Sequence, residues 1–150
     1  MDFRTKIDAA PFGERAEHSS QWLSMGSCFA YHMAQRMDRG KVRACVNPFG
    51  VLYNPVSIAR GLNILAGRKK VAESCLVPYG GLWHSFSFHG SFSDTSQRAA
   101  LEKMNGAIRA GADALNRAGH VIITFGTAWI YEFSPAYAAA NGLGHNPLVG

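Results

Sequence analysis

The chain has few of the features that mark membrane, secreted or disulfide-stabilised proteins. No apolar run approaches the roughly 20 residues needed to cross a bilayer, and residues 1–8 lack the apolar segment of a signal peptide. The cysteines are Cys28, Cys45 and Cys75, and an odd number argues against a closed disulfide framework. We therefore expect a cytoplasmic protein with reduced thiols and no membrane partner.

Sequence signatures of common cofactor and metal sites are also absent. The chain has no phosphate-binding loop, no dinucleotide-binding glycine pattern and no paired-cysteine zinc motif. His84 and His89 are five residues apart, and no nearby carboxylate or thiol completes a usual ligand set. We predict no cofactor and no metal. A polar strand edge is the favoured interpretation of His89, whereas a catalytic and a structural role are about equally open for His84.

Acidic residues are outnumbered by basic ones, which gives a net charge of +5. The basic side chains are spread along the chain, and those near helix ends are typical of helix C-termini. Because no basic motif is interleaved with aromatic residues, we predict no nucleic-acid partner. Binding to a nucleic acid or an anionic surface stays open as a third class of function, which a steep salt dependence of binding would reveal.

The pattern of apolar residues predicts one α/β domain. A chain of 150 residues with 47% hydrophobic residues can bury roughly 68–70% of its unfolded surface. Short β-like runs alternate with longer helical patterns, which is typical of a parallel sheet covered by helices. We predict strands over 21–25, 42–46 and 121–125, and helices over 29–39, from 55 to Gly67, and from 93–95 to Gly119. Residues 76–92 read as a surface excursion with a short strand.

Three of these elements carry more specific expectations. Asn54 is a good N-cap, with Pro55 at the first helical position. Phe29, with methionines at helical spacing, is expected on the buried stripe of the first helix. The β-branched run over 121–125 suits a central strand that is covered on both faces.

Ser27 and Cys28 place two potential nucleophiles where the first strand turns into the first helix. The unpaired N–H groups and positive dipole end of a helix start favour an anion, either a thiolate or an oxyanion. Two plain alternatives stand beside this interpretation. Ser27 is a preferred N-cap residue, and Cys28 is also compatible with a small buried hydrophobe. If Cys28 is an activated thiolate, we expect it to be the most rapidly alkylated thiol, with Cys45 and Cys75 as slow, packed residues.

Four sequence blocks resemble the GSCFA domain family, considered distantly related to the SGNH/GDSL hydrolases. The blocks occur in the family's order, and the resemblance covers residues from about 22 to 131. They are Gly26-Ser27-Cys28-Phe29-Ala30, Asn47-Pro48-Phe49-Gly50-Val51-Leu52-Tyr53-Asn54-Pro55, Trp83-His84-Ser85-Phe86 and Thr124-Phe125-Gly126-Thr127-Ala128-Trp129. The resemblance implies a three-layer α/β/α fold with a mostly parallel sheet and a reactive residue after the first strand.

The resemblance also implies roles for individual residues. An ungapped match to the Gly-Asp-Ser block of the wider family puts Cys28 at the nucleophile position, with Ser27 in place of the aspartate and as the second candidate. Gly50 matches a glycine whose N–H stabilises the oxyanion, and Gly126 belongs to the third block. The asparagine of that block is replaced, which leaves Thr127 or Asn47 as substitute donors.

The Asp-x-x-His base of the wider family does not occur in this sequence, and His145 lies in a stretch rich in glycine and asparagine. We therefore expect an N-terminal fragment of a longer protein. The resemblance implies an acyl-ester hydrolase or acyltransferase, on family analogy acting on an acylated carbohydrate. A noncatalytic ligand-binding module on the same fold is the alternative, and no oligomeric state is predicted.

Overall fold

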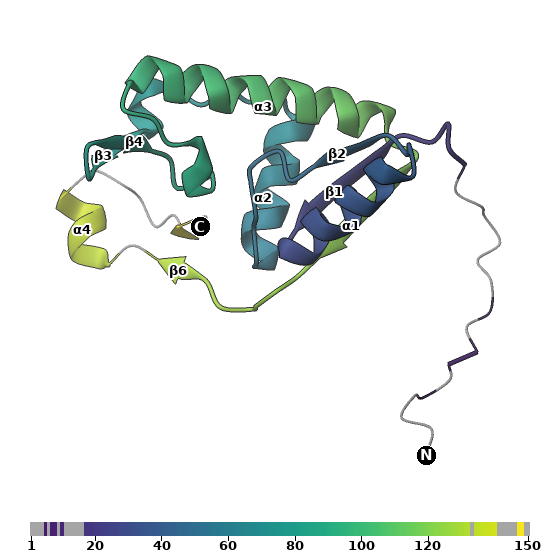
Figure 1. Ribbon diagram of the computed structural model, residues 1–150. Helices are drawn as coiled ribbons and strands as arrows, with labels where there is room; N and C mark the ends of the chain where they lie inside the picture. The colour runs from purple at the N-terminus through teal and green to yellow at the C-terminus, as the bar shows by residue number, and fades with distance from the viewer. Residues whose placement is uncertain are drawn as a thin grey trace.

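The chain folds into a mixed α/β structure, seen here in a computed structural model (Figure 1). The structure describes residues 5, 7, 8, 10, 17–132, 134–140, 147 and 148. The helices and strands are β1 (Trp22–Gly26), α1 (Cys28–Arg39), β2 (Ala44–Val46), α2 (Pro55–Ala66), β3 (Val77–Tyr79), β4 (Leu82–His84), α3 (Gln97–Arg117), β5 (His120–Thr124), β6 (Tyr131–Glu132), α4 (Pro135–Ala140) and β7 (Pro147–Leu148). Among the described residues, none of the helices combines the length and the hydrophobicity that a membrane-spanning segment requires.

A small parallel sheet organises the fold, with strand order β2-β1-β5. The register pairs Trp22 with Ala44 on one side of β1 and with His120 on the other, so that Gly26 lies opposite Thr124. Two antiparallel pairs, β3 with β4 and β6 with β7, complete the strand pairing of the described residues. The predicted α/β class with a mostly parallel sheet is confirmed.

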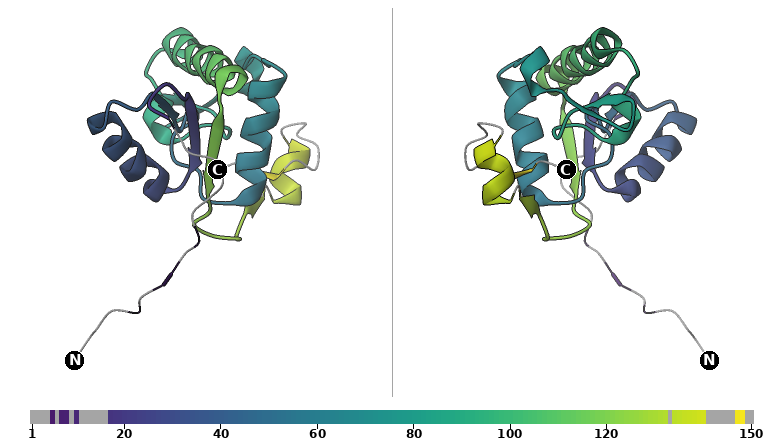
Figure 2. Two further views of the ribbon diagram at one scale, coloured as in Figure 1. Left: turned by 90° about the vertical axis from the view of Figure 1, so that its right-hand side faces the viewer. Right: turned by 90° about the vertical axis from the view of Figure 1, so that its left-hand side faces the viewer.

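Helices lie on both sides of the parallel sheet (Figure 2). α1 packs against β1, β2 and β5, whereas α3 packs against β1, β2 and α2. α3 approaches its neighbours closely at Gly111, where a Cβ atom would lie 2.8 Å from Pro48 and 2.9 Å from Leu65. The glycine therefore lets α3 lie directly on α2 and on the loop after β2, which offsets the helix propensity that an interior glycine loses.

The core lies mainly between β1, α2, α3 and the segment around Phe88. Its buried members are Leu23, Met25, Phe49, Leu52, Ile58, Leu65, Leu76, Phe88, Ala100, Met104 and Ile108. α1 buries mainly its alanines, Ala30 and Ala34, while Phe29 is 59% exposed. The prediction that Phe29 lies on the buried stripe is wrong, because α1 approaches the sheet through side chains small enough for close packing.

β5 lies at the end of the strand order β2-β1-β5, whereas the sequence predicts it at the centre of the sheet. Within the part of the chain that the structure describes, it pairs only with β1. Val121 and Ile123 are 46% and 41% exposed. The apolar run therefore forms a strand as predicted, but one face of it is partly open.

The predicted helix starts are confirmed at α2 and displaced at α3. Asn54 Oδ1 accepts the Ser57 N–H at 2.8 Å, and Pro55 is the first residue of α2. Such a cap typically contributes about 1 kcal/mol to stability. α3 begins at Gln97, because Ser96 caps the helix by accepting the Ala99 N–H.

Candidate functional site

Ser27 lies at the junction of β1 and α1 and is bound to the end of β5. It is 6% exposed and occupies the N-cap position of α1, but its side chain makes no capping bond. Its N–H donates to the carbonyl oxygen of Thr124 at 3.2 Å and to Thr124 Oγ1 at 3.0 Å. Its own Oγ lies 3.0 Å from the same Thr124 Oγ1. Helix capping therefore does not explain this serine.

Cys28 is the first residue of α1, and its free thiol is exposed. The alternative that it is a small buried hydrophobe is therefore wrong. Backbone N–H groups in the first turn of a helix lack intrahelical acceptors, and they create a partial positive charge there. The thiol thus stands in solvent beside groups that stabilise a negative charge.

Asn47 connects the loop after β2 to the end of β1. Its Oδ1 accepts the Gly26 N–H at 2.8 Å, and its own N–H donates to the Ser24 carbonyl oxygen at 2.8 Å. The side chain is 8% exposed, and its Nδ2 is buried without a hydrogen-bond partner among the described residues. A buried donor without an acceptor is costly, and the described residues supply no acceptor for Nδ2.

Gly50 lies in the same loop, but its N–H is already occupied. It donates to the Asn47 carbonyl oxygen at 2.7 Å and closes a tight turn. A Cβ atom at Gly50 would collide with the Cβ of His89. The glycine therefore lets His89 lie against the turn, and the N–H that the resemblance assigns to the oxyanion is used within this turn.

Gly126 and Thr127 follow β5 and join the loop that precedes α2. Both backbone N–H groups donate to the Tyr53 carbonyl oxygen, at 2.8 and 3.1 Å. A Cβ at Gly126 would lie 3.6 Å from the Ser27 Cβ, which places this glycine beside the serine. The Thr127 hydroxyl accepts the Trp129 N–H at 3.1 Å, so this side chain stabilises the turn in which it lies.

We call Ser27, Cys28, Asn47, Thr124 and Gly126 the Ser27 cluster. Hydrogen bonds join the first strand end to Asn47 and to Thr124, and Gly126 packs beside Ser27. All five residues lie at the carboxyl ends of parallel strands or just beyond them. Ligands characteristically bind at this edge of open α/β sheets.

His84 has its partners elsewhere. Its Nδ1 lies 2.8 Å from Ser93 Oγ and its Nε2 lies 3.1 Å from the Tyr79 carbonyl oxygen. Both ring nitrogens are thus used within the β3–β4 region. No group of three or more His, Cys, Asp or Glu side chains in the described residues is arranged to hold a metal ion, and His145 lies outside these residues.

Sequence reasoning overlooked Thr124 and the position of His89. Thr124 ends an otherwise apolar strand, and a polar residue at a carboxyl strand end is a signal that would have found it. His89, interpreted as a strand edge, instead donates its N–H to the Phe49 carbonyl oxygen at 2.8 Å. Its exposed ring therefore lies near the loop that carries Asn47, whereas His84 does not.

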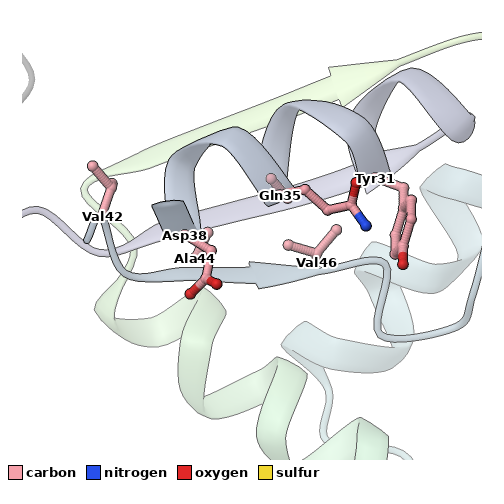
Figure 3. A pocket seen from close by; sticks show the side chains of 7 residues that line it. Tyr31, Gln35, Asp38, Val42, Ala44 and Val46 are labelled. Carbon is pink, nitrogen blue, oxygen red and sulfur yellow. The ribbon is translucent and has the colours of Figure 1, made fainter. Parts of the chain in front are cut away.

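A shallow cavity of about 240 Å³ lies beside β2, away from the residues of the Ser27 cluster. Figure 3 shows Tyr31, Gln35 and Asp38 of α1 on one side of it, opposite Val42, Ala44 and Val46. The lining is largely apolar and contains no serine, threonine or cysteine. We therefore assign no function to this cavity.

The three thiols differ in accessibility, and this gives a prediction. Burial raises the pKa of Cys45, while Cys28 and Cys75 are exposed, so the expectation that Cys75 is packed is wrong. Because the thiolate is the reactive form, iodoacetamide should modify Cys45 most slowly at pH 7.5. Peptide mass spectrometry over time measures the three rates, and a Cys45 rate equal to that of Cys75 would contradict the expectation.

Comparison with known protein families gives a match. The family model described as GSCFA family matches residues 21–144, a span that contains the whole Ser27 cluster. No curated protein matches the chain, and no solved structure matches it.

Proposed function

Since the chain belongs to the GSCFA family, we propose that it transfers acyl groups from esters, as a hydrolase or acyltransferase of SGNH type, with Cys28 as the nucleophile. The observation that carries this proposal is the contrast between two adjacent residues. Cys28 is exposed at the first position of α1, whereas the neighbouring Ser27 is buried with its oxygen beside Thr124. A free thiol is already a few per cent thiolate at pH 7, so it depends less on a neighbouring base than a serine does.

The proposed reaction has two steps. The Cys28 thiolate attacks the ester carbonyl, an S–C bond forms, the C–O bond breaks, and the leaving alkoxide takes a proton from solvent. Water or an acceptor alcohol then attacks the thioester, loses its proton, and releases the thiolate with the acid or the new ester. Both steps pass through a tetrahedral oxyanion, which requires hydrogen-bond donors.

Asn47 Nδ2 is the side-chain donor that we assign to this oxyanion, together with the N–H groups of the first turn of α1. It is buried and has no partner among the described residues, and the Oδ1 of the same amide is held by Gly26. The amide is therefore fixed in orientation before substrate binds. Such preorganisation is what makes an oxyanion donor effective.

Asn47→Asp is expected to lower kcat by roughly 100- to 1000-fold, because it keeps the acceptor for Gly26 but removes the Nδ2 donor. The measurement is steady-state hydrolysis of p-nitrophenyl acetate. Asn54→Asp is the matched control, since the same chemical change at a buried cap preserves the bond to Ser57. Equal kcat in the two variants would remove Asn47 from the mechanism.

The proposed function is tested by trapping the acyl-enzyme. The 150-residue chain is mixed with p-nitrophenyl acetate, quenched in acid within milliseconds to seconds, and mapped by peptide mass spectrometry. We expect acetyl on Cys28 at a level that rises and decays with turnover, while Cys75 serves as the exposed thiol for comparison. Acetyl on Ser27 instead would make the serine the nucleophile, and equal, slow labelling of Cys28 and Cys75 would overturn acyl transfer.

A noncatalytic ligand-binding module is the second candidate. Its support is that Ser27 Oγ has a threonine hydroxyl as its partner and that the Gly50 N–H is used in a turn. This candidate predicts that an ester or sugar binds without turnover, whereas the first predicts release of product. Stoichiometric binding with no acyl-enzyme would favour the module.

The finer features of the proposal rest on the family. A three-layer fold of SGNH type is supported by the helices on both sides of the parallel sheet (Figure 2). We propose an acylated carbohydrate as the substrate, because the family resemblance suggests it, and we keep a cytoplasmic location as a proposal. Hydrolysis of acetylated sugars, compared with p-nitrophenyl acetate, tests the substrate class.

A further inference from the structure

A second cavity, unrelated to the Ser27 cluster, lies between the end of α2 and the segment that follows β4. Its volume is about 430 Å³, within the range of small-molecule sites. It is lined by Arg60, Asn63, Ile64, Lys69, Lys70, Val71, Cys75, Ser85 and Ser87. Because none of these residues is acidic and three are basic, the cavity is electropositive.

Two of the cations are available for a ligand. Lys69 and Lys70 form no ion pair with any described residue, whereas the preceding Arg68 is bound to Asp113 at 2.7 Å. The ion pair neutralises Arg68 outside the cavity and leaves the two lysines uncompensated. Uncompensated cations in a concave site favour an anionic ligand.

The backbone that carries the lysines is held on both sides. The Lys69 N–H donates to the Ile64 carbonyl oxygen at 3.0 Å, which closes the end of α2. The Val71 N–H donates to Asn105 Oδ1 at 2.9 Å, and the amide of Asn105 returns a bond to the Val71 carbonyl oxygen at 3.1 Å. The two lysines are thus displayed from a fixed turn.

Neutral donors complete the site. Ser85 is 7% exposed, and its Oγ accepts the Ser87 N–H at 3.3 Å, so its own hydroxyl hydrogen has no acceptor among the described residues. Asn63 adds an amide to the lining, and Ile64 and Val71 add apolar surface. Cations, a hydroxyl and an amide around one cavity suit the oxygens of a phosphoryl group.

We propose that this cavity binds the phosphate group of a small phosphorylated molecule. Lys69 and Lys70 supply the charge, Ser85 supplies a hydrogen bond, and the half-buried Ile64 and Val71 contact the remainder of the ligand. The volume exceeds what a free phosphate ion needs, so a phosphate ester is expected to bind more tightly than inorganic phosphate. The site is independent of the acyl-transfer chemistry proposed for Cys28.

The test is titration calorimetry of the 150-residue chain with inorganic phosphate, glycerol 3-phosphate and sodium chloride at matched ionic strength. We expect inorganic phosphate and glycerol 3-phosphate to bind saturably, with the smaller Kd for glycerol 3-phosphate. In the double variant Lys69→Gln/Lys70→Gln, Kd should rise about tenfold or more. Arg36→Gln/Arg109→Gln, which removes two exposed charges elsewhere, is the matched control. No saturable binding, or equal weakening in the control, would overturn the site, and tighter binding of inorganic phosphate would make the free ion the ligand.

A second measurement needs no substitution. Cys75 lines the cavity and is exposed, so a bound phosphate group should slow its alkylation by the uncharged reagent iodoacetamide. We expect the Cys75 rate to fall severalfold with phosphate and to stay unchanged with chloride at the same ionic strength. Equal rates in the two salts would contradict occupancy of this cavity, even if the lysine variant failed to fold.

Discussion

Cys28→Ala is expected to lower kcat/KM for p-nitrophenyl acetate by roughly 1000-fold or more, because it removes the atom that forms the acyl-enzyme. Cys28 is exposed at the start of α1, so the substitution removes no buried contact and the variant should melt close to the wild-type temperature. Initial rates at several substrate concentrations give kcat and KM separately. Loss in kcat with little change in KM is the expected pattern, since ground-state binding does not depend on the sulfur.

Two control variants separate this result from nonspecific thiol chemistry. Cys75→Ala removes the other exposed thiol and should leave the rate within about twofold. Ser27→Ala should keep measurable activity if Ser27 only orients the junction through Thr124. A Cys28→Ala variant that retains full activity, together with an inactive Ser27→Ala variant, would transfer the nucleophile role to the serine.

Gly26→Ala is expected to destabilise the fold by about 2–6 kcal/mol, the sum of a strained backbone and an overpacked contact. Gly26 has φ +137°, and a Cβ there would collide with the carbonyl oxygen of Thr124. This is a large part of the roughly 5–15 kcal/mol that stabilises a typical domain. Urea denaturation followed by circular dichroism measures the change in the free energy of unfolding.

Gly80→Ala is the matched control for this substitution. Gly80 also has positive φ, +58°, but nothing lies within 4 Å of its added Cβ. Gly80→Ala should therefore lower the free energy of unfolding only through backbone strain, by about 1 kcal/mol. If the two variants are equally stable, the close approach of β1 and β5 is not what requires glycine at position 26.

The fold could be predicted where the structure of a segment depends mainly on interactions between residues that are close in the sequence. The Asn54-Pro55 helix start, the strand over 121–125 and the alternation of strands and helices all depend on nearby residues. The prediction for Phe29 is wrong because helical spacing shows which residues share one side of a helix, but not which side of the helix packs against the sheet. Strand order lies beyond local patterns, so the exposure of Val121 and Ile123 on β5 could not be foreseen from their hydrophobicity.

The sequence could predict which segments form the candidate site, but not which of their atoms are free to bind a ligand. The block order brought Ser27, Asn47 and Gly126 into one hypothesis, and the structure places them together. Whether a donor is free depends on tertiary hydrogen bonds, which no spacing reveals. The Gly50 N–H, which the resemblance assigns to the oxyanion, donates to the Asn47 carbonyl oxygen, while Asn47 Nδ2 has no partner among the described residues.

The bond between Ser27 and Thr124 joins residues that are 97 positions apart in the chain. At a synthesis rate of about 5–20 residues per second, a growing chain would expose the end of β1 for roughly 5–20 s before its β5 partner is made. During that interval α1 can form and cover one side of β1 and β2, but the Ser27 N–H has no acceptor from β5. The junction of β1, α1 and β5 therefore forms only after β5 has been synthesised, and a nascent chain stalled before residue 120 should carry the Cys28 thiol without the bonds between Ser27 and Thr124.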